Sequence, residues 1–285
     1  MPEPASTESR AVQREFELVQ RSEDHDLITV KSLAQQLQKL GVRAGMTLLV
    51  HSSLSSIGWV CGGAPAVILA LEQILGEEGT LVMPTHSTDL SDPAQWQHPP
   101  VPEKWWQQIR DEMPAYTPDL SPTREMGAIS ECFRKQDGTL RSNHPQVSFA
   151  ARGKNAKYVA GSHALEFSMG EGSPLARVYE LNGSVLLLGV GHGNSTSIHL
   201  AEYRADYPMK KTVRMGAPIY QDGMRQWVWF NDINFDDSDF VKLGSDFSEE
   251  TGLIITGKMG LANAQLMPQR QLVDYAVRWI EKNRI

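Results

Sequence analysis

The sequence predicts an α/β fold in which a central, mostly parallel or mixed sheet is flanked by helices in three layers and carries an appended antiparallel hairpin. First, short apolar runs such as 46–50, 80–84 and 185–190 alternate with stretches of helical periodicity, as strands alternate with helices in α/β proteins. Second, residues 213–220 and 226–230 have strand character and are joined by Gln-Asp-Gly-Met, a sequence typical of a tight turn.

The chain begins with a polar segment of mixed charge, residues 1–26, which we expect to form a loose N-terminal arm. A single domain is expected over residues 27–285, because no internal repeat or low-complexity linker divides it. Leucines at helical spacing predict a helix over residues 28–40, and Gly41 ends it.

A β-loop-α-β unit is predicted next, from the strand at 46–50 through a Ser- and Gly-rich loop and a helix over 65–75 to the strand at 80–84. Residues 89–122 are rich in Pro and Trp and show no clear period, so we expect a packed, lid-like excursion there. The other expected elements are helices over 124–133, 155–161, 175–182, 237–243 and 269–283, a helix from about residue 196, and a strand over 147–151.

The composition excludes several classes of protein. No apolar run approaches the roughly 18 residues of a membrane span, and the first 26 residues lack the apolar core of a signal peptide. No run of Lys and Arg indicates a nucleic-acid partner, and the two cysteines, Cys61 and Cys132, have no disulfide or zinc-site spacing. We therefore expect a cytoplasmic protein that binds neither nucleic acid nor membrane.

The net charge of −7 is concentrated in residues 231–250, where seven carboxylates face a single lysine. Most of these carboxylates are expected on a solvated surface. A focused negative potential also attracts cations, so the alternative is that one or two of them line a site for a cationic substrate.

The most informative segment is 185–202, in which a buried strand runs into a Gly-rich loop and then a short helix. His199 and Glu202 lie three residues apart on that helix, so their side chains share one face. A histidine against a carboxylate can act as a general base near neutral pH. The alternative interpretation is an exposed polar pair, but the position after a strand end favours a functional site.

Polar residues follow three of the predicted strands: His-Ser-Ser after residue 50, Thr-His-Ser after residue 84 and Gly-His-Gly-Asn after residue 190. In a mostly parallel sheet these ends meet at one edge and form a crevice. The loop over 51–63 is suited to phosphate because it leads into a helix N-terminus, although an ordinary capping loop is the alternative. Scattered histidines at 51, 86, 144, 192 and 199 leave a metal site possible in principle, but their spacing does not favour one.

Several short motifs occur in a fixed order between residues 50 and 202. The motifs are Val50-His-Ser-Ser-Leu with Gly62-Gly63, Gly79-Thr-Leu-Val-Met-Pro-Thr85, Glu125-Met-Gly, Arg141-Ser-Asn-His-Pro145 with Ser148-Phe149-Ala150, Gly170-Glu-Gly-Ser-Pro174, Leu186-Leu-Leu-Gly189 and His199-Leu-Ala-Glu202. Together they resemble the aminoglycoside N(3)-acetyltransferases, the antibiotic N-acetyltransferase family, which is distinct from the GNAT superfamily. The resemblance implies transfer of an acetyl group from acetyl-CoA, as co-substrate, to the 3-amino group of a polycationic aminoglycoside, which confers resistance.

The resemblance also implies roles for individual residues. His199 is expected to deprotonate the attacking amine, and Glu202 is expected to orient the His199 imidazole and stabilise its charge. The acetyl group is expected to pass directly to the amine in a ternary complex, without a metal. We expect Glu171 and Asp232 to bind substrate amines, and loop 51–55 to supply a donor to the thioester oxygen. The residues expected to hold the pantetheine and phosphates are His51, Ser52, Ser53, Leu54, Ser55, Thr85, Ser87, Met126, Gly127 and Arg141.

Some features depart from the family or stay open. The family usually has a small or aromatic residue where this chain has His86, and the 89–122 excursion matches no family segment, so acceptor choice is open. For His144 we expect a structural hydrogen bond near the cofactor. The alternatives are an acetyltransferase for a non-aminoglycoside amine, a CoA-binding protein without turnover, and a histidine-based metal hydrolase. The chain is expected to be a monomer or a homodimer.

Overall fold

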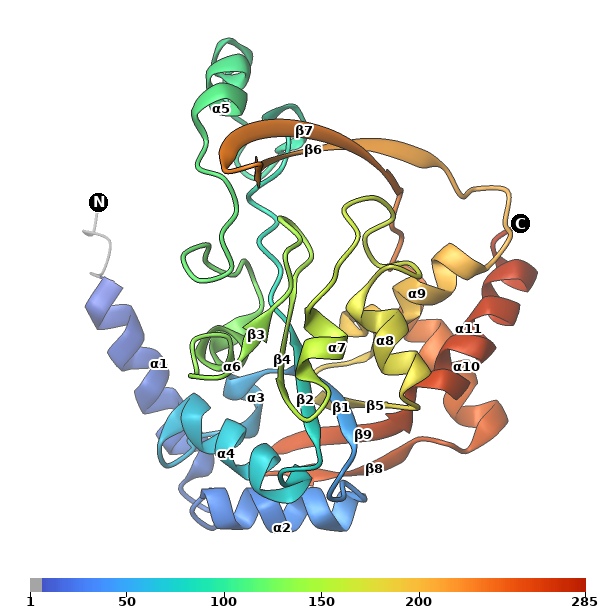
Figure 1. Cartoon of the computed structure of the whole chain (residues 1–285). Helices are drawn as coiled ribbons and strands as arrows, with labels where there is room; N and C mark the ends of the chain where they lie inside the picture. The colour runs from blue at the N-terminus through green and yellow to red at the C-terminus, as the bar shows by residue number, and fades with distance from the viewer. Residues whose placement is uncertain (1–6) are drawn as a thin grey trace, which may run out of the picture.

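A computed structural model describes the backbone of residues 7–285 and the side chains from residue 12 onward. Within these residues a seven-stranded mixed sheet forms the centre of the molecule, in the order β3-β4-β2-β1-β5-β9-β8 (Figure 1). Strand β1 pairs in parallel with both β2 and β5, and the outer pairings are antiparallel. The strands are β1 Thr47–Ser52, β2 Thr80–Pro84, β3 Leu140–Arg141, β4 Phe149–Gly153, β5 Ser184–Leu188, β8 Ile255–Met259 and β9 Ala262–Pro268.

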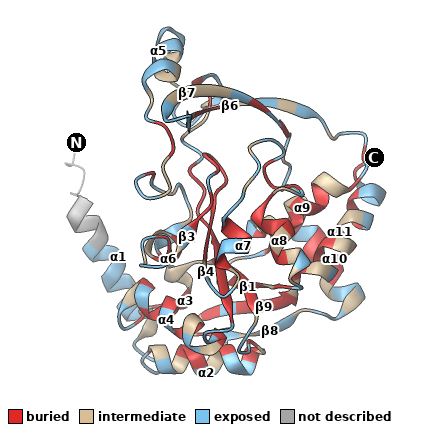
Figure 2. Cartoon of the chain, in the orientation of Figure 1, coloured by how far each residue is buried: buried red, intermediate tan, exposed pale blue. Residues whose placement is uncertain are grey.

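Helices cover both faces of the sheet and confirm the predicted three layers (Figure 2). Successive strand residues point to opposite faces, so Leu48 and Val50 join one apolar cluster while Leu49 joins the other. The first cluster is completed by α2 (Val30–Leu40), α4 (Gly63–Leu75) and α6 (Gly127–Phe133). The second is completed by α7 (Ala156–Ala160), α8 (Pro174–Glu180), α9 (Thr196–Arg204), α10 (Phe240–Thr251) and α11 (Gln269–Asn283).

Helix α2 illustrates how local sequence sets an element. Thr29 and Ser32 form a reciprocal capping box, in which each side chain accepts the backbone N–H of the other residue. Gly41 ends the helix in the left-handed conformation, with φ of 106°, which glycine adopts without a steric cost. Leu33, Leu37 and Leu40 of this helix are buried against the sheet, as their spacing predicts.

The predicted hairpin forms a separate two-stranded sheet of β6 (Thr212–Gln221) and β7 (Met224–Ile233), which arches over the carboxyl ends of the central strands (Figure 1). Its turn residues, Asp222 and Gly223, both have positive φ, as a tight hairpin turn requires. The excursion over 89–122 contains α5 (Trp106–Glu112) and two short 3₁₀ turns, η1 (Pro93–Gln95) and η2 (Glu103–Trp105), and α5 lies beside β7.

Several elements differ from the sequence-based expectation. The segment expected as a loose arm contains a regular helix, α1 (Thr7–Ser22), whose residues Val12, Phe16 and Val19 recur at helical spacing, while residues 1–6 lie outside the described part. The sequence did not reveal β8 and β9, because β8 is an edge strand that is mostly exposed and lacks a long apolar run. Helix α3 (Leu54–Ile57) also forms directly after β1.

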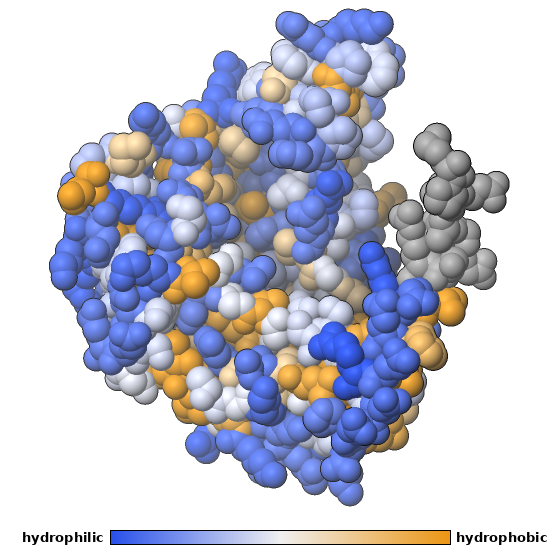
Figure 3. Space-filling model, turned by 180° about the vertical axis from the view of Figure 1, so that it is seen from behind, coloured by the Kyte–Doolittle hydropathy of each residue, from blue (hydrophilic) through white to orange (hydrophobic). Residues whose placement is uncertain are grey.

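The surface away from the sheet edge is largely polar. Seen from behind, hydrophilic residues cover most of the face and hydrophobic residues are scattered among them (Figure 3). From residue 7 onward, no helix has both the length and the apolar character that a membrane crossing requires.

We predict that Gly244→Ala destabilises the fold although alanine is the better helix former. A Cβ on Gly244, in α10, would lie 2.0 Å from Cγ of His192, whose buried ring belongs to the loop after β5. The expected loss in the free energy of unfolding is about 1–3 kcal/mol, the usual cost of overpacking, measured by urea denaturation.

The control is the same substitution in a His192→Ala background, where the ring is gone. There the cost should vanish, and an unchanged cost would show that the His192 contact is not its cause.

Candidate active site

A cavity of about 500 Å³ lies where the carboxyl ends of β1, β2 and β5 meet. The crevice predicted at this edge is present. Its walls include residues from the ends of the three strands and the loops that follow them, namely His51 and Ser52 of β1, Pro84, His86 and Thr88 at and after the end of β2, and Val190, Gly193, Asn194 and Thr196 after β5. The hairpin and the excursion supply further wall residues, among them Met215 and Trp96. The mouth of the site is therefore built from segments outside the central sheet.

His199 and Glu202 form the dyad that their spacing on α9 predicts. The Nδ1–H of His199 donates to Oε2 of Glu202 at 2.5 Å, which leaves Nε2 as the free nitrogen of a ring that lines the cavity. The rings of Phe235 and Phe240 lie 5.1 and 4.9 Å from the imidazole, centroid to centroid. The carboxylate fixes the tautomer and the two aromatic rings limit the movement of the imidazole, which is what a general base requires.

The second oxygen of Glu202 is bound from the far end of the chain. Oε1 accepts a hydrogen bond from Nη1 of Arg284 at 2.6 Å and another from the backbone N–H of Asp236 at 3.1 Å. Glu202 is fully buried, so these contacts and His199 are the groups that compensate its charge. Sequence reasoning missed Arg284, because a basic residue near a chain end carries no local signal of a buried partner 82 positions away.

Two further histidines in the cavity wall are neutral at physiological pH. Burial lowers the pKa of His51 to about 3, and the proximity of His199, which disfavours a second proton nearby, adds to the effect. Burial also lowers the pKa of His86 to about 3, with smaller contributions from neighbouring basic groups, His199 foremost. Nε2 of His86 and Oγ of Ser52 are buried without a hydrogen-bond partner among the described residues. The wall therefore offers unpaired polar atoms to a bound molecule.

The scattered histidines do not converge on a metal site. Among the side chains described, those of residues 12–285, no three His, Cys, Asp or Glu are grouped as a metal ion would require. His144 instead has the structural role expected for it: its Nδ1 accepts the backbone N–H groups of Gln146 and Val147, and its Nε2–H donates to the carbonyl of Leu165. Burial lowers the pKa of His144 well below the ordinary value, so the neutral ring links the backbone of residues 146–147 to that of Leu165 by hydrogen bonds.

The residues expected to bind acetyl-CoA divide into two groups. His51, Ser52 and Met126 line the cavity, and Gly127 starts α6 with its backbone close to Ser52. The first group also includes three residues of the adjoining loop, Ser53, Leu54 and Ser55. Ser53 precedes the short helix α3, and Leu54 and Ser55 begin it; none of the three lines the cavity.

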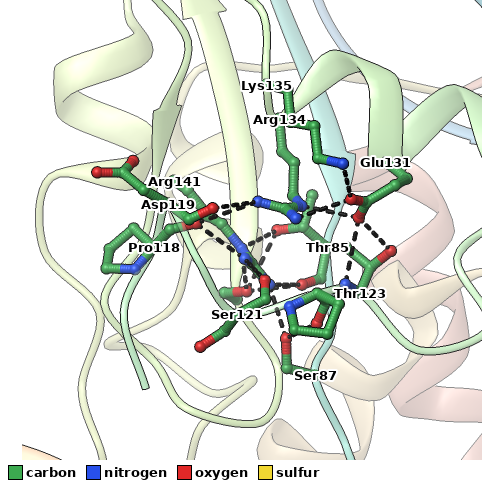
Figure 4. A network of polar contacts seen from close by, with 12 residues as sticks. Thr85, Ser87, Pro118, Asp119, Ser121, Thr123, Glu131, Arg134, Lys135 and Arg141 are labelled. Atoms are coloured by element: carbon green, nitrogen blue, oxygen red, sulfur yellow. Dashed lines mark hydrogen bonds and ion pairs between the residues drawn. The ribbon is translucent and has the colours of Figure 1, made fainter. Parts of the chain in front are cut away.

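Arg141, Thr85 and Ser87 form the second group, and the structure places them in a buried network instead of the cavity wall (Figure 4). The guanidinium donates to the carbonyl and hydroxyl of Thr85 and to the hydroxyl of Ser87, and it reaches the carbonyls of Pro118 and Ser121 at 2.9 and 2.6 Å. Its Nε also donates to Ser148, so every side-chain nitrogen is engaged. Arg141 therefore ties the excursion to the end of β2 and has no donor left for a phosphate.

The two carboxylates expected to bind substrate amines also lie elsewhere. Asp232 is 2% exposed, and its oxygens accept hydrogen bonds from the hydroxyl and backbone N–H of Ser168, the Tyr203 hydroxyl and the N–H of Ile233. Glu171 is a surface residue paired with Arg204 at 2.7 Å. Neither lines the cavity, because a buried carboxylate is occupied by its own donors and Glu171 faces a different surface.

The charged residues that do line the cavity are acidic. Glu125 and Asp237 belong to the wall, and no Lys or Arg of the described chain does. Asp237 follows the hairpin, within the acidic tract of 231–250, and its side chain is exposed. The site therefore favours a cationic ligand next to His199.

Comparison with known proteins agrees with this geometry. The sequence model of the family described as aminoglycoside 3-N-acetyltransferase matches residues 49–281. The SPbeta prophage-derived aminoglycoside N(3')-acetyltransferase-like protein YokD of Bacillus subtilis strain 168 is 47% identical, over 90% of this chain and 93% of its own. Aminoglycoside N(3)-acetyltransferase VII of Streptomyces paromomycinus is 36% identical, over 94% and 96%.

Solved structures give the same result. The binary complex of AAC-IIIb with CoASH superimposes with a TM-score of 0.81 at 30% identity, covering 91% of this chain and 98% of that one. AAC-VIa bound to sisomicin also superimposes with a TM-score of 0.81, at 28% identity, covering 91% and 99%. The similarity thus extends over nine-tenths of the chain.

We predict that Arg141→Lys destabilises the protein without weakening CoA binding by the folded fraction. Lysine keeps the charge but cannot reach all the acceptors of the network, so the free energy of unfolding should fall by about 2–4 kcal/mol. Urea denaturation measures the first quantity and calorimetric titration with CoA the second.

Arg152→Lys is the matched control, because Arg152 forms a half-exposed pair with Glu72 and should lose less than about 1 kcal/mol. Weaker CoA binding by a stably folded Arg141→Lys protein would contradict this prediction and support the direct phosphate contact that the sequence predicts.

Proposed function

The chain belongs to the aminoglycoside 3-N-acetyltransferase family, and on that premise we propose that it transfers the acetyl group of acetyl-CoA to the 3-amino group of an aminoglycoside, which inactivates the drug. The observation that carries this proposal is the His199–Glu202 dyad, whose free Nε2 belongs to the wall of an acidic cavity. An amine substrate is a cation, and it attacks only after losing a proton. The site supplies both a negative field and a base.

In the proposed reaction, the ammonium group of the acceptor first releases one proton to solvent. Nε2 of His199 then accepts a second proton from the neutral amine as the nitrogen attacks the thioester carbonyl carbon. The new C–N bond forms and the C–S bond breaks, and His199 then passes the proton to the departing sulfur. Glu202 compensates the imidazolium charge while the proton resides on the ring. Direct attack is the economical route, because neither Cys61 nor Cys132 lines the cavity as a nucleophile would.

We assign the thioester-oxygen donor to Ser52. Its hydroxyl is buried, lacks a partner among the described residues, and belongs to a residue of the cavity wall. An unpaired buried hydroxyl costs free energy, and it would gain a hydrogen bond as negative charge develops on the thioester oxygen. This places the donor within loop 51–55, at the end of β1.

Acetyl-CoA is the co-substrate in this proposal, and AAC-IIIb, which has been solved with CoASH, supports it. The residues that fit its pantetheine are those lining the cavity near β1 and α6, namely His51, Ser52 and Met126. A cytoplasmic location belongs to the proposal as well, since acetyl-CoA is produced by metabolism inside the cell.

For the acceptor, Asp237 and Glu125 replace the carboxylates expected from the sequence. Both line the cavity, whereas Asp232 and Glu171 do not. The sisomicin complex of AAC-VIa supports an aminoglycoside in the acceptor position. Because Ser91, Gln95 and Trp96 of the excursion also form the wall, this segment is placed to select among aminoglycosides.

We predict that His199→Ala lowers kcat/KM by at least about a hundredfold, the lower end of a general-base contribution. CoA release from acetyl-CoA is followed with a thiol reagent across a panel of aminoglycosides. His25→Ala, a substitution of an exposed histidine, should leave turnover unchanged. Acetyl-CoA binding without turnover on any drug by the unmodified protein would refute the aminoglycoside assignment.

We predict that Asp237→Asn raises KM for the aminoglycoside roughly fivefold and leaves KM for acetyl-CoA unchanged. The change corresponds to about 1 kcal/mol for an exposed ion pair, and it should shrink as salt is added. Asp246→Asn removes the same charge on α10 outside the cavity wall and serves as the control. Equal aminoglycoside KM values for the two variants would remove Asp237 from the acceptor site.

A further inference from the structure

Arg284 is the second-to-last residue of the chain and lies beyond the segment, 49–281, that the family model matches. It is nevertheless buried, with 9% of its surface exposed, and it stands directly behind the catalytic dyad. A charged side chain is buried this far only when strong partners hold it. The partners of Arg284 are all near the base.

The guanidinium of Arg284 is bound on every nitrogen. Nη1 donates to Glu202 at 2.6 Å, Nε and Nη2 form a bidentate pair with Asp239 at 2.8 and 2.6 Å, and Nη2 also donates to the carbonyl of Asp236. The ring of Tyr207 lies 5.4 Å from the guanidinium carbon. These contacts fix the chain end against α9 and against the loop that precedes α10.

Glu202 needs this cation. Its carboxylate is fully buried, and burial disfavours the charged form unless an opposite charge or strong donors compensate it. His199 is neutral before it accepts a proton, so it contributes a hydrogen bond but no charge at that stage. The N–H of Asp236 contributes one more hydrogen bond, which leaves Arg284 as the cation in direct contact with Glu202.

We propose that Arg284 is a positioning residue of the catalytic dyad, which keeps Glu202 ionised and aligned with His199 and sets the pH at which the dyad takes up a proton. The inference rests on the proposed function and adds a residue to its machinery. Arg284 does not face the cavity and acts through Glu202.

Other charged and titratable groups also surround the dyad. Asp239 faces Arg284, and Asp236 and Asp237 lie in the loop before α10. His51 from β1 and His86 from the loop after β2 lie near His199, and Tyr207 follows α9. Loss of Arg284 leaves the carboxylates of Glu202 and Asp239 without their shared cation. The dyad then takes up a proton at higher pH, whether that proton resides on His199 or on Glu202.

The sign of the effect follows. The active dyad has a neutral His199 and an ionised Glu202, and protonation abolishes it. In Arg284→Met the acidic limb of the kcat/KM profile should therefore move upward by at least about one pH unit. In Asp239→Asn, where a competing anion is removed and the cation remains, the limb should move downward.

Two measurements are made on the full-length protein. The first is the pH profile of kcat/KM, and the second is an NMR titration of ¹⁵N-labelled His199, assigned by comparison with His199→Gln. The titration needs no turnover, so it tests Arg284 even if the aminoglycoside assignment fails. Arg284→Lys keeps the cation and should titrate close to the unmodified protein, with a lower kcat from the looser geometry.

Arg270→Met is the matched control, because Arg270 lies on α11, is half-buried, and packs on Tyr179 away from the dyad. Arg270→Met should change the free energy of unfolding without shifting the acidic limb of the kcat/KM profile or the NMR titration of His199. Opposite shifts in Arg284→Met and Asp239→Asn support the proposal. If His199 titrates identically in the unmodified protein and in folded Arg284→Met or Asp239→Asn, Arg284 only stabilises the chain end and the proposal is overturned.

Discussion

The burial of the Glu202 carboxylate is the constraint on which the active site depends. An ionised carboxylate removed from water must be surrounded by donors, and here they come from α9, from the loop before α10 and from the C-terminus. The same contacts that satisfy the charge also hold the His199 imidazole in one tautomer and orientation. In the proposed mechanism, the stability of the buried carboxylate and the readiness of His199 to act as the base are therefore one structural requirement, and a chain that lost the partners of Glu202 would lose both.

A second buried ion organises the opposite side of the cavity. Arg141 binds the end of β2 and the carbonyls of the 89–122 excursion, so the segment that closes the site is anchored through a cation to the sheet. Between the two buried ions lies a wall of neutral histidines and an unpaired serine hydroxyl. The cavity wall thus combines buried neutral groups with the exposed carboxylates of Glu125 and Asp237.

Much of the fold and part of the site could be predicted. Short apolar runs, stretches of helical periodicity and polar residues after strand ends predicted the sheet, both helical layers and the crevice. The spacing of His199 and Glu202 on one helix predicted their contact. The structure places Arg141 and Asp232 outside the cavity wall, which their motifs did not indicate, because a motif identifies a residue without showing whether its polar atoms face a ligand or the protein. The polar atoms of both side chains are hydrogen-bonded to other residues of the protein. Asp237, which is exposed in the cavity wall, does not belong to any sequence motif that we identified.

The sequence by itself therefore determined the features that arise within one element or between neighbouring ones: the strands, the capped helices, the hairpin turn and the histidine–carboxylate pair. Only the tertiary structure decided which charges are buried and which remain available, because that depends on contacts between residues far apart in the chain. Arg284 and Glu202 are 82 positions apart, and no local pattern records their contact. The burial of a side chain and the ion pairs it forms are properties of the packed chain. They distinguish the charged residues that are bound inside the protein from those that remain exposed in the cavity wall.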